Sequence, residues 1–433
     1  MSAAPVEVLR VLAWGRQVGA AATSTRPPFA SFEYDPEWLA SGPELSPLLM
    51  PHAQGRRLHT FRDLDPAAFH GLPPLLADSL PDSFGNALAE AYLAGDQATP
   101  RSLTGLDRLA YLGGRGLGAL TFEPDRGARA SGEAASDLAG LVAAARAVVD
   151  GGMSGKGGRR AAVRRLQGIG TSAGGAQAKA LIWVDGGEVL TRPGAGPPLE
   201  PWILKFDLAS PPGLPAAPQG AGPVEYAYHL MARAAGVEVP EARLVEQSAG
   251  AHFMVRRFDG GPDGERLHQQ SLAGLAGLDF LQLGAHSATQ LFGVAARLGL
   301  GTAARSEILR RIAFNVLAGN RDDHPKNHAF LMTPEGEWSL APAYDLTFAF
   351  DPANLWLARH HLAVEGKTAG ISRADLMALA DRCAVPSGGE VLDHVEHGIG
   401  QWPGLARDAG VPQAAVDVIT GRLAALRRDW EQG

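Results

Sequence analysis

Three oxygen-bearing side chains with a defined spacing stand out in the last third of the chain. Asp322 is followed five residues later by Asn327, and Asp345 follows eighteen residues after that. A carboxylate can orient a hydroxyl nucleophile and take its proton, while carboxylate and amide oxygens are ligands that Mg2+ accepts. Asp322 as the base, with Asn327 and Asp345 as the metal ligands, would suit phosphoryl transfer from a magnesium-bound triphosphate.

The spacing from Asp322 to Asn327 matches the catalytic loop of protein kinases, in which the base precedes a metal-binding Asn by five residues. A polar loop whose acidic residues only cap turns is the structural alternative. Asp323 places a second carboxylate beside Asp322, and two neighbouring acids can raise the pKa of one of them. The spacing favours Asp322 as the base, but it leaves the choice between the two acids open.

The elements around this loop are suited to holding it. Residues 306–318 carry apolar side chains at helical spacing, and Gly319 follows as a helix-ending residue. Residues 328–332 and 338–341 are short apolar runs separated by turn residues, which predicts a hairpin. A buried helix would therefore deliver the loop, and the hairpin would carry Asp345 back beside it.

A glycine-rich stretch lies upstream, at residues 168–175 (GIGTSAGG), immediately before a predicted strand at 180–184. Glycines let backbone amides approach phosphate oxygens without a side chain in the way. The stretch lacks the GxGxxG spacing, and Lys179 is not followed by Ser or Thr as a Walker lysine would be. A flexible surface loop is therefore the alternative to a phosphate-binding loop.

Lys205 lies within an apolar run at residues 202–206, which predicts a strand. A buried lysine costs several kcal/mol without a partner, so an anionic ligand such as the phosphates of ATP is one reason for its position. An edge-strand lysine that points to water is the alternative. Glu225, at the start of a predicted helix at 225–235, is a candidate ion-pair partner, although it could equally interact with the helix dipole.

Ordered motifs along nearly the whole chain resemble those of the HipA family of serine/threonine kinases, the toxin half of bacterial toxin-antitoxin pairs. The motifs that carry the resemblance are LPDSFG at 80–85, the stretch 108–124 with its GLGAL, GAQAK at 175–179, ILK at 203–205, RFD at 257–259, the loop NRDDHPKN at 320–327 and YDLT at 344–347.

The resemblance implies an α+β fold class with a bilobal, protein-kinase-like architecture. A sheet-rich nucleotide lobe and an all-helical C-terminal lobe would follow an extra N-terminal α/β subdomain. The expected domains are a HipA-type N-terminal subdomain at 1–125, a helix and Gly/Arg-rich linker at 126–165, a nucleotide-binding lobe at 166–260 and a helical catalytic lobe at 261–433.

The resemblance also implies ATP and Mg2+ as cofactors, with Asn327 and Asp345 on the metal and Asp322 as the base. Ser172 in the glycine-rich loop would be autophosphorylated, which adds roughly −1.5 to −2 charge beside the phosphate site and would expel the loop by repulsion. The residues expected to contact the nucleotide are Lys205, Ser172, Ala173, Gly174, Gly175, Arg256, Phe258, Asp259, His324 and Lys326.

As a member of this family, the chain would inhibit growth by phosphorylating a translation-related protein such as an aminoacyl-tRNA synthetase. It would pair with a HipB-like DNA-binding antitoxin and contact DNA only through that partner. Arg256 departs from the Glu that relatives usually carry, which puts a Glu-mediated contact to the adenine in doubt. A small-molecule or lipid kinase of the same fold, and a catalytically weak antitoxin-binding module, are the alternative functions.

Composition limits the other function classes. The chain has 433 residues, 45% hydrophobic content and a net charge of −7, which argue for a globular protein and against a stand-alone nucleic-acid binder. A basic cluster at 156–165 is most simply a solvated linker, with docking to DNA or to an acidic surface as the minority interpretation. No apolar stretch reaches the roughly 18 residues of a membrane span and no signal peptide is recognisable, so we expect a cytoplasmic location. The single cysteine, Cys383, excludes an internal disulfide and is expected to fill the core.

Overall fold

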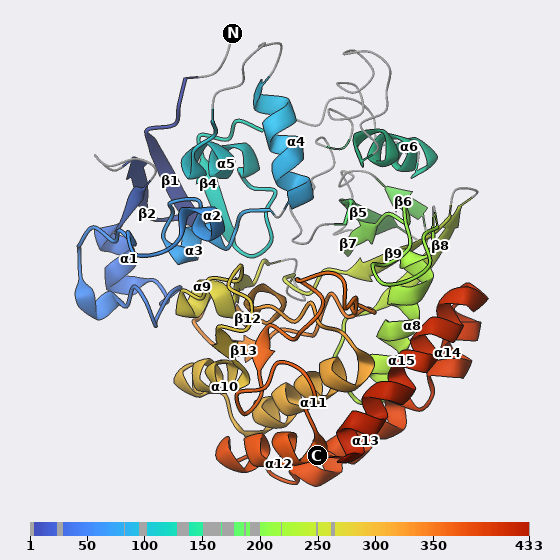
Figure 1. The fold of residues 1–433 in the computed structure, drawn as a ribbon. Helices are drawn as coiled ribbons and strands as arrows, with labels where there is room; N and C mark the ends of the chain where they lie inside the picture. Colours follow the sequence, from blue (N-terminus) through green and yellow to red (C-terminus); the bar gives the residue numbers. More distant parts are fainter. Residues whose placement is uncertain are drawn as a thin grey trace. The chain divides into compact units, whose positions relative to one another are not determined.

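The computed structural model describes residues 4–23, 29–81, 83–94, 102–127, 138–149, 166, 177–185, 188–190, 200–217, 219–247, 250–260 and 265–432. The chain divides into two compact units. Unit 1 comprises Met1–Phe206, Met254–Gln270 and Leu331–Glu337, and unit 2 comprises Asp207–Phe253, Ser271–Phe330 and Trp338–Gly433. Helices and strands are mixed throughout, which confirms the predicted α+β class (Figure 1).

Unit 1 contains an N-terminal sheet and a second sheet that is formed later in the chain. Its elements are β1 (Val8–Ala13), β2 (Arg16–Thr23), β3 (Ala30–Tyr34), α1 (Pro36–Ser41), η1 (His52–Gln54), α2 (Pro66–Phe69), α3 (Pro74–Ala77), α4 (Ser83–Ala94), α5 (Gly105–Leu112), β4 (Leu120–Glu123), α6 (Leu138–Val149), β5 (Lys179–Asp185), β6 (Glu188–Leu190), β7 (Glu200–Lys205), the end of β9 (Gly250–Arg256), most of β10 (His268–Ser271) and the end of β12 (Ala329–Met332).

The N-terminal sheet of unit 1 has the strand order β3-β2-β1-β4, and its neighbouring strands are antiparallel. Buried and exposed positions alternate along β1, as expected for a strand with one face in the core: Leu9, Val11 and Ala13 are buried while Val8 and Arg10 are exposed. Helix α5 begins with a capping box in which Thr104 and the side chain at the third helical position bond reciprocally. A conventional half-buried sheet with a capped helix therefore makes up this part of unit 1.

In the second sheet of unit 1, β6, β5, β7 and the end of β9 lie in that order. β5 and β7 are antiparallel, and their register places Ile182 opposite Trp202, both fully buried. The strands predicted at 180–184 and 202–206 are therefore present, each beginning one or two residues earlier than expected.

Unit 2 is mostly helical, with short strand pairs. Its elements are α8 (Ala221–Ala234), β8 (Ala242–Gln247) beside the beginning of β9, α9 (Leu272–Ala276), β11 (His286–Ser287), α10 (Ala288–Arg297), α11 (Thr302–Ala318), η2 (Pro325–Asn327), the beginning of β12, β13 (Trp338–Leu340), β14 (Leu362–Ala363), α12 (Arg373–Arg382), α13 (Gly388–Ile399), α14 (Trp402–Asp408) and α15 (Gln413–Gln432).

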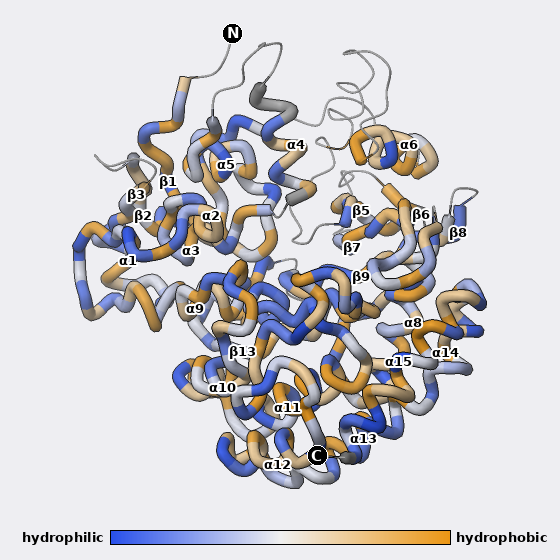
Figure 2. The backbone as a smooth tube through the Cα atoms, in the orientation of Figure 1, coloured by the Kyte–Doolittle hydropathy of each residue, from blue (hydrophilic) through white to orange (hydrophobic). Residues whose placement is uncertain are grey.

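Helix α11 is the centre of unit 2, because α10, α12, α13 and α15 all contact it. Its last three turns are buried on nearly every side, including Phe314 and Asn315, which lie outside the apolar stripe read from the sequence. Figure 2 shows hydrophobic stretches along α11 and hydrophilic ones along α12 and α13. The predicted helix is confirmed, but it is more completely enclosed than a one-faced pattern predicts.

The beginning of α8 corrects the sequence prediction, which started this helix at residue 225. The helix starts at Ala221, so Gly222 and Pro223 lie in its first turn, where a proline loses no intrahelical hydrogen bond. A Cβ at Gly222 would lie 1.9 Å from the carbonyl oxygen of Ala251, so this close approach requires glycine. Oδ1 of Asp207 accepts hydrogen bonds from the amide of Gly220 at 2.6 Å and from the amide of Ala221 at 2.8 Å. Asp207 therefore caps the helix.

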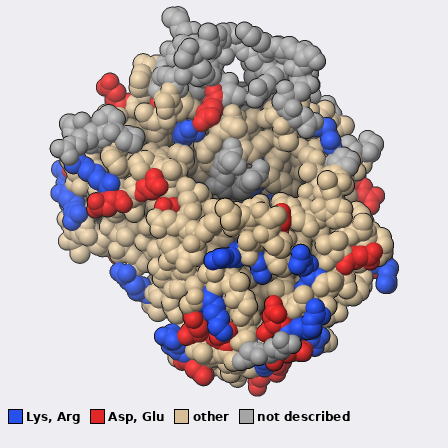
Figure 3. Space-filling model, in the orientation of Figure 1, with Lys and Arg blue, Asp and Glu red and all other residues tan. Residues whose placement is uncertain are grey.

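Surface charges on the helical unit are paired rather than separated. Arg373 of α12 pairs with Asp393 at 2.7 Å and with Glu396 at 2.8 Å, both on α13. Along the lower edge of the face drawn in Figure 3, basic and acidic side chains are interspersed. Cys383 follows the end of α12 and is only half-buried, so the expectation that it fills the core is wrong.

Candidate active site

The end of α11 presents the predicted catalytic loop. Gly319 terminates the helix in the left-handed conformation, at φ 65°, and its amide donates to the carbonyl oxygen of Asn315. Asn320 then donates from Nδ2 to Oδ1 of Asn315 at 2.9 Å. The chain therefore leaves a rigid, buried helix through a fixed turn, as the position of Gly319 in the sequence predicted.

The first residues of the loop are tied to a segment beyond Asp345. The amide of Ala349 donates to Gly319 at 3.2 Å, and the amide of Arg321 donates to Ala349 at 3.1 Å. The Arg321 guanidinium lies 3.6 Å from the centre of the Phe350 ring and also donates to the carbonyl oxygen of Ala358. Burial lowers the pKa of Arg321 to about 10, so this guanidinium remains charged at neutral pH.

Further hydrogen bonds hold the far end of the loop. The hydroxyl of Tyr344 donates to the carbonyl oxygen of Lys326 at 2.5 Å, and Nδ2 of Asn327 donates to the carbonyl oxygen of Asp322 at 2.6 Å. Asp345, next to Tyr344, adopts a left-handed backbone at φ 53°, which non-glycine residues hold only where the surroundings require it. The hairpin of β12 and β13 thus returns the chain to the loop, as the sequence predicted.

The two neighbouring acids have different surroundings. The Asp322 side chain is 38% exposed, whereas the Asp323 side chain is 7% exposed. Both oxygens of Asp323 accept hydrogen bonds, Oδ1 from the amide of His361 at 2.7 Å and Oδ2 from Nδ1 of His360 at 2.9 Å. Burial alone would raise the pKa of Asp323, but the interactions with His360, followed by those with His361, outweigh it and hold the pKa below its usual range. Asp322 is therefore the accessible acid and Asp323 an internal one.

His324 and Lys326, the two loop residues expected to contact the nucleotide, both lie near the Phe280 ring. His324 is buried, with its ring 5.7 Å from that of Phe280 and its Nε2 3.7 Å from Oδ1 of Asp322. The ammonium of Lys326 lies 4.7 Å from the centre of the same Phe280 ring. His324 therefore lies beside Asp322, and contact of either residue with a nucleotide remains a prediction.

Sequence reasoning missed three residues that lie beside Asp322 and Asp323. Trp356, His360 and His361 follow Asp345 in a segment of turns, and Nε1 of Trp356 donates to Oδ1 of Asp322 at 2.6 Å. The sequence offered one signal, an apolar Leu-Trp-Leu run inside an otherwise polar stretch. Nothing in the local pattern indicates which residue Trp356 contacts.

Unit 1 holds the predicted phosphate-binding lysine in an unusual register. Lys205 is 6% exposed, and it lies directly opposite Lys179, which is 2% exposed, on the antiparallel strands β7 and β5. Directly opposed residues of an antiparallel pair share one face of the sheet, and like charges there repel. Two buried lysines on one face concentrate positive charge there. The alternative in which Lys205 points to water is wrong.

The RFD motif at 257–259 has a structural role within unit 1. Asp259 is 2% exposed and accepts from the amide of Gly118 at 2.7 Å and from Nε of Arg257 at 2.8 Å. It thereby joins the predicted N-terminal subdomain to the strand end. Arg256 is exposed and pairs with Glu200 at 3.1 Å, and Phe258 is half-buried. Nucleotide contacts by Arg256, Phe258 and Asp259 remain predictions.

The glycine-rich loop, with Ser172, Ala173, Gly174 and Gly175, lies outside the described residues, as does most of the 126–165 linker. Glu225, the candidate partner of Lys205, is a buried residue of α8 in unit 2. Its pairing with Lys205 remains a prediction.

Among the described residues, no group of three or more His, Cys, Asp or Glu side chains could hold a metal ion. A kinase magnesium site does not need such a group, because phosphate oxygens and water complete the coordination of one or two side chains. Among the described helices, none combines the length and apolar character that a bilayer span requires.

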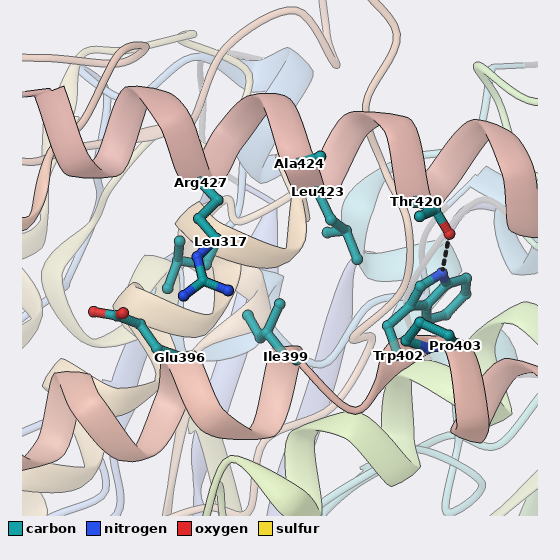
Figure 4. Close-up of a pocket in the computed structure, with 10 residues that line it drawn as sticks. Leu317, Glu396, Ile399, Trp402, Pro403, Thr420, Leu423, Ala424 and Arg427 are labelled. Carbon is teal, nitrogen blue, oxygen red and sulfur yellow. Dashed lines mark hydrogen bonds between the residues drawn. The ribbon is translucent and has the colours of Figure 1, made fainter.

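A cavity of about 210 Å3 lies elsewhere in unit 2, among α11, α13, α14 and α15 (Figure 4). Trp402 forms one wall and donates from Nε1 to Oγ1 of Thr420 at 3.1 Å. Leu317, Ile399 and Leu423 make it largely apolar. None of the predicted site residues lines this cavity.

Comparisons with known proteins place the chain in a family. The family model of the HipA-like C-terminal domain matches residues 171–429, and that of the HipA N-terminal domain matches residues 9–123. The solved complex of the Shewanella oneidensis toxin-antitoxin system HipA, HipB and its operator DNA contains a chain of similar fold. The TM-score is 0.66 at 18% identity, over 97% of this chain and 96% of that one.

Two curated proteins align over shorter stretches. A candidate kinase of Sinorhizobium fredii is 29% identical over 157 residues, which is 34% of this chain and 36% of that protein. The serine/threonine-protein kinase toxin HipA of Shewanella oneidensis is 43% identical over 60 residues, 14% of either chain. The aligned part thus spans about a third or less of either curated relative. Because the C-terminal family model alone matches more than half of the sequence, the chain belongs to the HipA family.

Proposed function

We propose that this chain is an ATP- and Mg2+-dependent serine/threonine protein kinase that acts as a HipA-like toxin in the cytoplasm. The four-part organisation expected from the sequence, with a nucleotide-binding lobe at 166–260 and a catalytic lobe at 261–433, is part of this proposal. The observation that carries it is the difference between the two adjacent acids. Asp322 is accessible to a substrate, while Asp323 is buried with both oxygens already bonded.

The residues present fit a magnesium-bound nucleotide. Because Nδ2 of Asn327 donates to the carbonyl oxygen of Asp322, its Oδ1 is the atom left to ligate a metal ion. Asp345 would supply the second ligand. Mg2+ would neutralise charge that develops on the phosphate oxygens during transfer. Lys205 would hold the α- and β-phosphates, and Lys179, directly opposite it on the same face of the sheet, would add positive charge beside them.

In this proposal Asp322 orients a serine or threonine hydroxyl of the substrate and accepts its proton. The expected substrate is a translation-related protein, with an aminoacyl-tRNA synthetase as the first candidate. The expected partner is a HipB-like DNA-binding antitoxin, supported by the fold shared with a HipA chain that was solved together with HipB and operator DNA. Autophosphorylation of Ser172 would inactivate the kinase by adding negative charge beside the phosphates.

Incubation of the purified chain with ATP radiolabelled at the γ-phosphate tests the proposal. We expect label on Ser172, loss of label in Asp322→Asn, and dependence of labelling on Mg2+. Ser172→Ala should keep transfer to a protein substrate while ending self-inactivation. Transfer to small molecules or lipids alone would favour a different kinase class. Absence of any ATP turnover, with antitoxin binding intact, would favour a binding module.

Expression in a host cell tests the toxin part separately. Growth arrest should disappear with Asp322→Asn, and phosphoproteomics after induction should identify the substrate. Growth arrest undiminished by Asp322→Asn would remove phosphoryl transfer from the explanation.

A further inference from the structure

The hydrogen bond between Trp356 and Asp322 has no role in the reaction as proposed so far. The indole Nε1 donates to Oδ1 of Asp322 at 2.6 Å, across 34 residues of sequence. This is a short, charge-assisted contact, a type of hydrogen bond about twice as strong as a neutral one. Its acceptor is the carboxylate that the proposed function assigns as the base.

Trp356 is held firmly enough to position another group. Its amide donates to Oδ1 of Asn354 at 3.0 Å, and its carbonyl oxygen accepts from Nε2 of His361 at 3.0 Å. The His361 ring also packs edge-on against the indole, with centroids 4.3 Å apart. The next residue, Leu357, is 5% exposed and anchors the segment in the interior. The indole is therefore fixed through both its backbone and its ring.

The second acid of the loop anchors this arrangement. Oδ1 of Asp323 accepts from the amide of His361 at 2.7 Å, and His361 in turn contacts Trp356. A continuous set of contacts thus runs from Asp323 through His361 and Trp356 to Asp322. Asp323 thus fixes the segment that carries Trp356, and the Trp356 indole fixes Asp322.

The geometry distinguishes positioning of the base from obstruction of it. A carboxylate has two oxygens, each with two acceptor sites, and the indole occupies one site on Oδ1. Among the described residues, no hydrogen-bond donor is recorded for Oδ2 of Asp322, and the side chain is 38% exposed. A donor on one oxygen restricts rotation of the carboxylate and leaves the other oxygen open to a hydroxyl group.

We propose that Trp356 is a positioning residue, whose indole N–H holds Oδ1 of Asp322 so that Oδ2 receives the substrate hydroxyl. This inference rests on the proposed function. In the transfer step, the hydroxyl oxygen bonds to the γ-phosphorus and its proton passes to Oδ2. The bond from the γ-phosphorus to the bridging oxygen breaks, and ADP leaves with that electron pair. A fixed carboxylate favours the step because misaligned reacting groups lower the rate sharply.

Trp356→Phe tests this role, since it removes the donor and keeps an aromatic ring. We expect kcat to fall about tenfold, the effect of losing one charge-assisted hydrogen bond. The KM for ATP and the rise in melting temperature on ATP binding should stay unchanged, because the indole orients the base and not the nucleotide. A merely structural role would lower the affinity for ATP or the melting temperature along with kcat.

Trp430→Phe is the matched control. The Trp430 indole likewise donates to a carboxylate, Oε1 of Glu396 at 2.8 Å, but it lies in α15 and is buried, whereas Trp356 is half-buried. The same substitution there should lower the melting temperature and leave kcat unchanged. A fall in kcat equal to that of Trp356→Phe would attribute the effect to general destabilisation and overturn the inference.

A sulfur isostere separates the donor from the shape of the ring. Benzothienylalanine, introduced at position 356 by stop-codon suppression, keeps the bicyclic ring and lacks the N–H, so it should reproduce the loss in kcat even where Phe disturbs packing. Unchanged kcat with this isostere would overturn the inference and leave the proposed function intact. A rise in kcat would also overturn it, by showing that the indole obstructs the base. If the unsubstituted chain transfers no phosphate, the proposed function fails and the inference fails with it.

Discussion

Oδ2 of Asp323 accepts a hydrogen bond from Nδ1 of His360 at 2.9 Å, in a site where both side chains are almost completely buried. This contact joins the predicted catalytic loop to a residue 37 positions downstream. It gives a structural role to Asp323, a carboxylate that the kinase loop pattern does not require. Asp323 fixes the downstream segment against the loop, and the neighbouring Asp322 remains free to meet a substrate.

The two acids should therefore respond differently to the same substitution. Asp322→Asn should reduce phosphoryl transfer by about 100-fold or more, the usual contribution of a positioned base, and leave the melting temperature unchanged. Asp323→Asn should lower the melting temperature, because an amide nitrogen would replace one of its two acceptor oxygens. Parallel radiolabel and thermal-unfolding measurements check both. Stable folding with lost transfer in Asp323→Asn, together with normal transfer in Asp322→Asn, would reverse the assignment.

His360→Ala should destabilise unit 2 strongly. The substitution leaves the buried Asp323 carboxylate without one of its two donors, which costs about 3 kcal/mol. Chemical denaturation measures the loss. His397→Ala on an exposed face of α13 is the control and should change stability by less than about 0.5 kcal/mol. Equal effects of the two substitutions would mean that the Asp323 contact contributes little.

Replacing either buried lysine should weaken nucleotide binding. Lys205→Met and Lys179→Met retain the apolar stem and remove the charge, so each should reduce the increase in melting temperature that saturating ATP produces. Arg243→Met, at an exposed surface pair with Glu241, is the control and should leave the ATP response unchanged. An undiminished ATP response in both lysine variants would place the phosphates elsewhere.

Stability should fall as the pH drops from neutral to 5, and His229 should contribute to the fall. Burial lowers its pKa from 6.5 to about 4, so between these values the unfolded chain binds a proton that the folded chain does not. The free energy of unfolding therefore rises with pH across this window. The contribution of His229 is at most about 3 kcal/mol, and it is lost as the pH falls through the window. Denaturation at pH 7 and pH 5 should show a smaller difference in His229→Gln than in His397→Gln. An identical pH response in the two variants would exclude His229 as a contributor.

Much of the site could be predicted from the sequence because the signals are local. The helix at 306–318 follows from apolar spacing, its end from Gly319, and the hairpin from two apolar runs around a turn. The apolar run around Lys205 correctly indicated a strand with a buried cation. Each of these depends on side chains within one or two turns of chain, whose conformational preferences act before any tertiary contact forms.

Other features depend on residues that are far apart in the sequence. Asp207 caps α8 from 13 residues upstream, so the helix begins before a local reading of its Pro and Gly residues predicts. The opposition of Lys179 and Lys205 depends on strand register, which the sequence of either strand alone does not specify.

The sequence by itself determined the family, the fold class and the residue types of the candidate site. Only the tertiary structure decided which of two adjacent acids is accessible. Asp322 and Asp323 have the same side chain and nearly the same local surroundings in the sequence. They differ because folding brings Trp356 to one and His360 and His361 to the other. Burial and hydrogen bonding are properties of the packed chain, and they give two identical carboxylates different chemistry.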